Sequence, residues 1–274
     1  MQANPRYRSG SGQVRPPNER FDKAPERDDP PQSELARLRQ AERFRAQFYS
    51  VLHHELKSPL TSLRAALDML TGPEKSETHN TITARLLDNM GRSTARPERL
   101  ISDLLDVALA RGDDLSIHKG PVDVSNVIHQ VVTELAPAAG AKEVFISGGW
   151  RGGDGPTVAG DEIRLQQIMA NLLTNAIKAS PERGPVLIDI VEDADANVAA
   201  ITVSNRKGPL DPELKDRLFE PFQKSSAGGY AAGTGLGLSV VGSLAAAHGG
   251  RIELDDSEGW LRFTVPIPLW RGRG

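Results

Sequence analysis

Apolar residues recur at steps of three and four in two long stretches of this chain, and that spacing limits the possible folds more than any other feature. The first stretch runs from Leu35 to Leu70 and the second from Ile82 to Leu109. Steps of three and four place side chains on one face of a helix. A Gly-Pro pair within residues 71–78 separates the two stretches. The pattern predicts a hairpin of two amphipathic helices over residues 33–112.

A single helical hairpin of this length has too small a core to be stable. Two copies that pack their apolar faces together would form a four-helix bundle and so enlarge that core. The sequence therefore predicts a homodimer joined through the hairpin. Pro97 lies inside the second stretch and is expected to kink that helix or to start a new segment.

After Gly120 the pattern changes to short strands alternating with helices. Helices are expected at residues 122–139, 161–180 and 235–250, and strands at residues 144–148, 157–160, 186–193, 197–205, 250–256 and 260–268. Asp161 is expected to cap the helix that follows it. These elements predict an α/β sandwich over residues 120–270, which is an ordinary size for one domain.

Composition excludes several classes of function. Residues 1–32 are rich in Pro, Gly and charge and poor in aliphatic side chains, so we expect a disordered tail. A net charge of −3 without a basic block argues against nucleic acid as a partner. The absence of cysteine excludes disulfides and cysteine catalysis. With no secretory signal and no run of about 18 apolar residues, the chain is expected to be cytoplasmic and to have no membrane segment.

The first helical stretch contains two adjacent histidines, His53 and His54. At about 100° per residue, His54 shares a polar stripe with Ser58, whereas His53 lies nearer the apolar side. An exposed neutral imidazole is a nucleophile, and the neighbouring Glu55 could take its proton. Pro59 removes a backbone hydrogen bond and loosens the helix beyond the histidine. A surface histidine without function is the alternative; a metal site is disfavoured because adjacent histidines diverge on a helix.

Four short motifs occur in a fixed order along the chain. They are "HELKSPL" at residues 54–60, "NLLTNAIKAS" at 171–180, "RLFEPFQKS" at 217–225 and "GTGLGLSVV" at 233–241. One such motif alone would be weak support for any function, but four in order are specific. Together they resemble the phosphoacceptor box, N box, F box and second glycine box of sensor histidine kinases, a likeness that covers about residues 35–268.

The resemblance assigns roles to three residues of the second motif. Asn175 is expected to hold Mg²⁺ and the phosphates of ATP, with assistance from Asn171. Hard Mg²⁺ accepts an amide oxygen and bridges phosphate oxygens. Lys178, on the same face of the predicted helix, could reach a phosphate as a point charge. The alternative is a pair of asparagines on a wet helix face.

The glycine-rich motif opens a predicted helix, where bare amides and the helix dipole can cradle a polyphosphate. The preceding residues 223–232 look like the loop that closes over the nucleotide, and Phe219 and Phe222 are expected to anchor that loop or to belong to the core. The nucleotide-binding residues implied in this region are Phe219, Lys224, Gly233, Thr234, Gly235, Leu236 and Gly237.

One motif departs from the family pattern. Where the family has Asp-x-Gly-x-Gly, this chain has Asn205, Lys207 and Pro209 at the three defining positions, and Gly208 substitutes for a glycine if the loop shifts by one residue. The family's Asp binds the adenine amino group. An Asn oxygen can accept the same hydrogen bond, but without charge the bond should be weaker.

The resemblance implies a dimeric helical hairpin, a four-helix bundle in the dimer, followed by a Bergerat-type α/β sandwich that binds ATP. The implied reaction moves the γ-phosphoryl group of ATP to His54, with Glu55 as general base and Mg²⁺ neutralising the phosphates. Ser58 could orient a water for the reverse phosphatase step. Because no receiver domain is recognisable in the chain, the phosphoryl group would pass to an aspartate of a separate response regulator.

Two other classes of function remain open from the sequence. The altered glycine motif could mark a pseudokinase, a dimeric scaffold that binds a response regulator or another kinase without ATP turnover. A different ATPase on the same sandwich, such as an anti-sigma serine kinase or a chaperone-type ATPase, is disfavoured by the residues 54–60 motif. Nucleotide binding would discriminate the first alternative from the kinase.

Overall fold

The computed structural model describes part of the chain. The described residues are 35, 39, 41–53, 57, 60, 61, 64, 100–110, 115–149, 155–206, 210–223 and 234–272. The chain divides into two compact units, Met1–Phe44 and Arg45–Gly274. The labelled strands and helices below all belong to the second unit. None of the described helices is long and apolar enough to cross a membrane.

Two described segments belong to the predicted hairpin, residues 41–53 and 100–110, and both are helical. In the second segment Leu100, Leu104 and Val107 are buried, at spacings of four and three residues. This is the apolar stripe that the periodicity predicts. The predicted tail, the turn at 71–78 and Pro97 lie outside the described residues.

The remainder of the unit contains a five-stranded sheet covered by helices. The strands lie in the order β2 (Phe145–Gly149), β4 (Pro185–Asp193), β5 (Val198–Arg206), β7 (Trp260–Pro268) and β6 (Glu253–Ser257). The β2–β4 pair is parallel and the other pairs are antiparallel. A strand that joins a sheet in parallel needs a crossover connection, and here a helix provides it.

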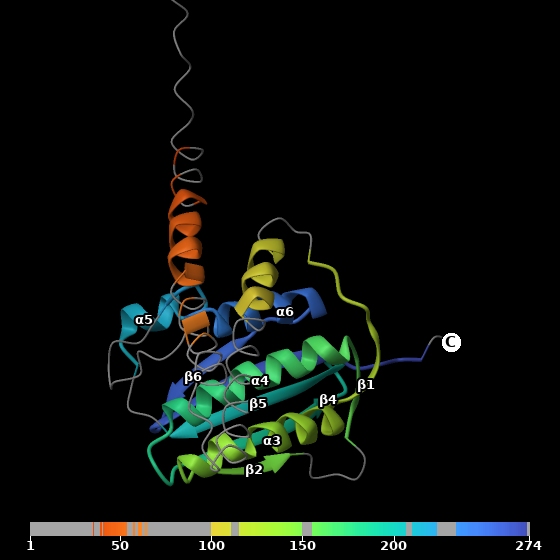
Figure 1. Ribbon diagram of the computed structural model, residues 1–274. Coiled ribbons are helices and arrows are strands. Elements are labelled where there is room, and N and C mark those ends of the chain that lie inside the picture. The colour runs from red at the N-terminus through yellow and green to blue at the C-terminus, as the bar shows by residue number, and fades with distance from the viewer. Residues whose placement is uncertain are drawn as a thin grey trace, which may run out of the picture. The chain divides into compact units, whose positions relative to one another are not determined.

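That helix is α4 (Glu162–Ala179), which lies beside α3 (Val124–Ala141) over the sheet (Figure 1). On its other flank α4 contacts α6 (Gly237–His248), and α6 in turn contacts β7. A short helix, α5 (Pro212–Arg217), follows β5. The result is a sheet-and-helix domain that follows a helical region, so the predicted fold class is confirmed.

Two short elements differ from the sequence-based expectation. β1 (Gly120–Asp123) pairs antiparallel with β3 (Thr157–Gly160), where a helix was expected to begin at residue 122. The helix begins later because the Asp123 carboxylate accepts hydrogen bonds from the backbone N–H groups of Ser125 and Asn126, at 2.8 and 3.2 Å. This is an N-cap, which leaves the residues before it extended. Helix α5 was not predicted.

The core lies between the helical layer and one face of the sheet. Strands β4 and β7 alternate buried and half-buried residues, as expected for strands with one face on a core. From α4, Leu172 and Leu173 are fully buried, and Phe263 of β7 is 1% exposed. Each such side chain contributes about 1.5–3 kcal/mol to folding. This packing holds α4 rigidly, and with it the polar residues on the flank of that helix.

Candidate nucleotide-binding site

Asn171 and Asn175 lie one turn apart on α4 and are both half-buried. The side-chain Nδ2 of Asn171 is buried and has no hydrogen-bond partner among the described residues. A buried amide without a partner costs free energy unless a ligand supplies one. Lys178, near the end of the helix, is exposed.

Asn171 faces the first residue of α6. A Cβ atom added to Gly237 would lie 3.6 Å from the Oδ1 of Asn171, so the absence of a side chain keeps this space open. Within the described part of the chain, no side chain caps the N-terminus of α6. The first N–H groups of a helix have no intrahelical partner, and the helix dipole favours an anion there. The amide of Asn171 and the N-terminus of α6 therefore border one polar, anion-compatible space.

The turn before α6 is held by its own hydrogen bond. The hydroxyl of Thr234 accepts from the backbone N–H of Leu236 at 3.3 Å, so this hydroxyl shapes the turn. The Leu236 side chain is fully buried. The predicted role of Leu236 in nucleotide binding would therefore fall to its backbone, because its side chain belongs to the core.

A close backbone contact joins the F box to the glycine motif. The N–H of Phe222 donates to the carbonyl oxygen of Gly235 at 2.8 Å. Gly235 has a φ of +72°, and an added Cβ would lie 2.7 Å from the Gln223 carbonyl oxygen. Phe222 itself has a φ of +67°, a conformation that costs free energy in a residue with a side chain. The sequence suggested that Phe222 anchors the following loop or belongs to the core, and in the structure its backbone joins this segment to the glycine turn.

Phe219, the other aromatic residue of the F box, packs on the core. Its ring meets that of Phe263 edge to face, with centroids 6.3 Å apart and planes at 87°. Such pairs contribute about 0.5–1.5 kcal/mol beyond the area they bury. The structure thus places Phe219 as an anchor of this segment on the core.

Asn205 lies near the end of β5 and is 1% exposed. Its Nδ2 donates to the carbonyl oxygen of Arg206 at 3.2 Å. Its Oδ1 is buried and has no partner among the described residues. The amide therefore presents a buried acceptor without a partner among the described residues, near the end of β5.

The structure brings Asn171 beside Gly237, and Gly235 beside Phe222. Asn205 lies on β5, and helix α4, which carries Asn171 and Asn175, packs against that strand. Six other predicted site residues lie outside the described residues: His54, Glu55, Ser58, Gly208, Lys224 and Gly233. Among the residues the structure describes, no three His, Asp or Glu side chains gather as a metal site, so Mg²⁺ would depend on an amide ligand and on phosphate oxygens.

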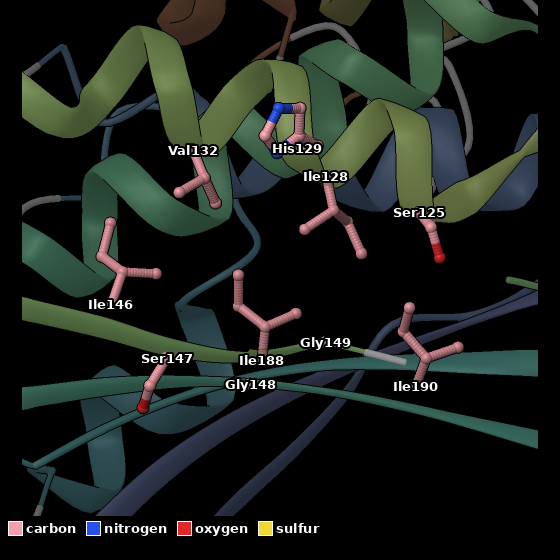
Figure 2. A pocket seen from close by; sticks show the side chains of 10 residues that line it. All are labelled: Ser125, Ile128, His129, Val132, Ile146, Ser147, Gly148, Gly149, Ile188 and Ile190. Carbon is pink, nitrogen blue, oxygen red and sulfur yellow. The ribbon is translucent and has the colours of Figure 1, made fainter. Parts of the chain in front are cut away.

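The larger of two described cavities lies elsewhere in the domain. It has a volume of about 200 Å³ and lies between α3 and the β2–β4 edge of the sheet (Figure 2). Isoleucines from both layers line it together with His129, Val132, two serines and two glycines, and Ser125 lies at one end. None of the predicted site residues lines this cavity. It is therefore separate from the space that Asn171 and Gly237 border.

Two family models match the chain. Residues 44–112 match the His Kinase A (phospho-acceptor) domain. Residues 160–271 match the histidine kinase-, DNA gyrase B- and HSP90-like ATPase. The second match covers both asparagines of α4, Asn205 and the glycine motif, which are the residues whose geometry is described above.

Known proteins show the same combination. The bacteriophytochrome of Pseudomonas aeruginosa is 30% identical over 237 residues, which cover 84% of this chain and 30% of that protein. The sensor protein CutS of Streptomyces coelicolor is 31% identical over 240 residues, which cover 85% of this chain and 55% of that protein. The chain thus spans about half or less of the length of these relatives.

A solved structure agrees with these relatives. Full-length ShkA, crystallised in complex with AMPPNP, has a TM-score of 0.59 and 25% sequence identity, covering 83% of this chain and 47% of that one. The matched fold, the matched domains and the unsatisfied amides lead to one conclusion: the chain belongs to the sensor histidine kinases of two-component systems, with a His Kinase A region followed by an ATPase domain of the gyrase B and HSP90 type.

Proposed function

We propose that this chain is an active protein-histidine kinase. In this proposal the hairpin of residues 33–112 carries the phosphoacceptor, His54, and the sandwich of residues 120–270 binds ATP. The proposal includes transfer of the phosphoryl group to an aspartate of a response regulator. The family and its ATP-binding domain support the general activity.

The observation that carries the proposal is the orientation of the Asn205 amide. Its NH₂ group donates to the Arg206 carbonyl, so the oxygen is the atom without a partner among the described residues. An acceptor in this position suits the amino group of adenine. It would clash electrostatically with the carbonyl oxygen of guanine, since two acceptors cannot share a proton. Asn205 thus supports adenine nucleotide binding although it lacks the charge of the family's Asp.

The phosphates would lie between α4 and α6. The buried Nδ2 of Asn171 is a donor without a partner in the described part of the chain, and the N–H groups that begin α6 at Gly237 are donors too. The amide oxygen of Asn175 would hold Mg²⁺, which neutralises phosphate charge and bridges phosphate oxygens. The Phe222–Gly235 contact would fix the position of the glycine turn beneath them.

The reaction follows from the chemistry of the phosphoacceptor box. A nitrogen of the His54 imidazole attacks the γ-phosphorus, an N–P bond forms, and the bond from phosphorus to the β–γ bridging oxygen breaks. ADP leaves with that electron pair, and Glu55 takes the proton from the imidazole. Ser58 would orient water in the reverse phosphatase step.

The hairpin would also be the dimer interface. In the described parts of the hairpin, four large hydrophobic side chains are at least half exposed: Tyr49, Leu60, Ile101 and Leu105, at 67, 63, 50 and 56%. Leu105 follows Ile101 by four residues, so both lie on one exposed face of the helix, away from the buried stripe. A second copy that covers this face would supply the core that one hairpin lacks.

The test is incubation with γ-labelled ATP and Mg²⁺, comparing the wild type with the His54→Ala, His53→Ala and Asn175→Ala variants. We expect acid-labile label on the wild type and on His53→Ala and none on the other two. His53→Ala is the matched control, because it removes the adjacent imidazole. Label that persists on His54→Ala would assign the phosphoacceptor elsewhere.

Nucleotide binding separates the kinase from the scaffold. Titration with ADP and Mg²⁺ should show saturable binding that Asn175→Ala weakens. No label and no nucleotide binding in the folded wild type would contradict the proposal and favour a pseudokinase. Two of the three residues that suggested a pseudokinase, Lys207 and Pro209, lie outside the described residues, and the third, Asn205, presents the acceptor that adenine needs.

A further inference from the structure

The helical segment 100–110, at the end of the hairpin, carries two buried carboxylates. Asp103 is 6% exposed and Asp106 is 1% exposed. Aspartate is seldom buried in proteins unless it is paired. The partners of these two residues therefore show what the end of the hairpin is built to contact.

Both carboxylates meet the first half of α4. Arg164 Nη1 lies 2.9 Å from Asp106 Oδ2, and Gln167 Nε2 lies 2.8 Å from the same oxygen. Gln167 Nε2 also donates to Asp103 Oδ1 at 3.2 Å. The Oε1 of Gln167 accepts from Arg164 Nη1 at 2.9 Å, which orients the amide. Four side chains thus form one connected network between the hairpin and the ATPase domain.

The connecting chain is also fastened at the start of α4. The backbone N–H of His118 donates to Asp161 Oδ2 at 3.1 Å, and the N–H of Asp161 donates to His248 Nε2 at 3.1 Å. Lys119 Nζ reaches the carbonyl oxygen of His248 at 3.3 Å. The stretch 161–167 therefore binds the chain on both sides of the connection 111–117. It contacts Asp103 and Asp106 before the connection and His118 after it.

Helix α4 links these contacts to the nucleotide amides. Asn171 lies four residues beyond Gln167, about 6 Å along the helix, and Asn175 one turn further. Because α4 is packed in the core, it moves as a rigid body with its two asparagines. The contacts with the hairpin end therefore set where the whole phosphate site lies relative to the hairpin, without changing the geometry inside that site.

A buried ion pair is suited to orientation more than to stability. The cost of removing both charges from water offsets most of their attraction, whereas a displaced partner leaves a buried charge unpaired. Arg164 is still 26% exposed on its side chain, so the network lies at the rim of the contact. The network therefore favours one orientation of the ATPase domain relative to the hairpin end over other orientations.

We propose that Arg164 and Gln167 are positioning residues that anchor the ATPase domain on the end of the phosphoacceptor hairpin. This inference rests on the proposed function of the chain as a kinase. The anchor lies next to the connecting chain, which is the pivot about which the ATPase domain would rotate. Atoms near a pivot move least when the domain rotates. The anchor raises the effective concentration of bound ATP at His54 by limiting the orientations of the domain. Nucleotide affinity itself does not depend on it.

The test is a double-mutant cycle on the full chain with Arg164→Gln, Asp106→Asn and the combination of both. Arg164→Lys is the conservative variant, because it keeps the charge but loses the bond to Gln167. Arg262→Gln is the matched control, since Arg262 is 29% exposed and pairs with Asp255 on the sheet. Each variant is assayed for the autophosphorylation rate at saturating ATP, for ADP affinity, and for hydrogen exchange.

We expect Arg164→Gln to lower the autophosphorylation rate about tenfold or more, with ADP affinity within about twofold of the wild type. The double variant should lose less than the sum of the single changes, because no buried charge is left unpaired. Arg164→Lys should stay within about threefold of the wild type, and Arg262→Gln should be unaffected. The anchor would be overturned if Arg164→Gln changed the autophosphorylation rate and the ADP affinity by equal factors. It would also be overturned if the effects of Arg164→Gln and Asp106→Asn on the rate were strictly additive in the double variant.

Hydrogen exchange keeps this inference separate from the proposed function. The amides of residues 100–110 and of His118 should exchange about tenfold faster in Arg164→Gln than in the wild type or in Arg262→Gln. This readout needs no catalysis. A wild type without autophosphorylation but with this difference would contradict the kinase and retain the anchor. Unchanged exchange would overturn the anchor even in an active kinase.

Discussion

Replacing Gly235 with Ala should damage the nucleotide site through a defined collision. Gly235 has a φ of +72°, where a residue with a Cβ costs about 1–2 kcal/mol. In addition, the new Cβ would lie 2.7 Å from the Gln223 carbonyl oxygen and 2.7 Å from the Phe222 carbonyl carbon. Since both contacts are with backbone, the collision must displace either the F box or the turn that begins α6.

Gly249→Ala isolates the backbone cost from the collision. Gly249 has a φ of +90° at the end of α6, and the nearest atom to an added Cβ is Pro268 Cγ at 4.0 Å. Both variants should lose about 1–2 kcal/mol from the unfavourable φ, or roughly 2–8 °C in Tm for a domain of this size. Only Gly235→Ala should also displace groups at the phosphate site.

The assay is titration with ADP and Mg²⁺ under conditions where both variants are folded. Gly249→Ala should bind with a Kd within about twofold of the wild type. Gly235→Ala should raise the Kd at least about tenfold, which corresponds to about 1.4 kcal/mol of lost binding free energy. Equal affinities for the two variants would refute the reasoning, because the collision would then have no effect on the site.

Three further changes test other parts of the domain. Asn205→Asp places a carboxylate at a site that is 1% exposed, so the nucleotide-free Tm should fall, and saturating ADP should raise the Tm more than in the wild type. Burial lowers the pKa of His248, so between that value and 6.5 the unfolded chain binds a proton that the folded chain does not. The free energy of unfolding should therefore fall as the pH drops below about 6.5, and urea titrations should show a flatter pH dependence in His248→Gln. Lys142→Met removes an ammonium group from three carbonyl oxygens at the C-terminus of α4, so urea denaturation should show a loss of about 1–2 kcal/mol.

Much of the sandwich followed from local patterns in the sequence. Asp161 was predicted to cap α4, and its carboxylate does accept from the backbone N–H of Arg164 at 3.3 Å. Gly249 ends α6 in the left-handed conformation that favours glycine. The strand β1 was missed because Val122 reads equally well as the first residue of an amphipathic helix. Its pairing with Val158 depends on a strand that is distant in the sequence.

The candidate site was predictable as a set of residues but not as a set of contacts. The spacing of Asn171 and Asn175 places them on one face of a helix whatever surrounds it. The direction of the Asn205 amide depends on the Arg206 carbonyl, which no motif specifies. No motif singled out Asp103 and Asp106, because contact with a helix some sixty residues away in the sequence is what buries them.

The hydrogen bond between Phe222 and Gly235 also has an entropic consequence. It joins the two ends of the segment 223–234 within the folded domain. Closing a loop costs conformational entropy that grows only slowly with its length. Because the ends are already joined, that cost falls on folding and is absent from nucleotide binding. The segment between them can therefore gain or lose residues with little added entropic cost to ATP binding, provided that Lys224, Gly233 and Thr234, the expected nucleotide-binding residues within it, are kept.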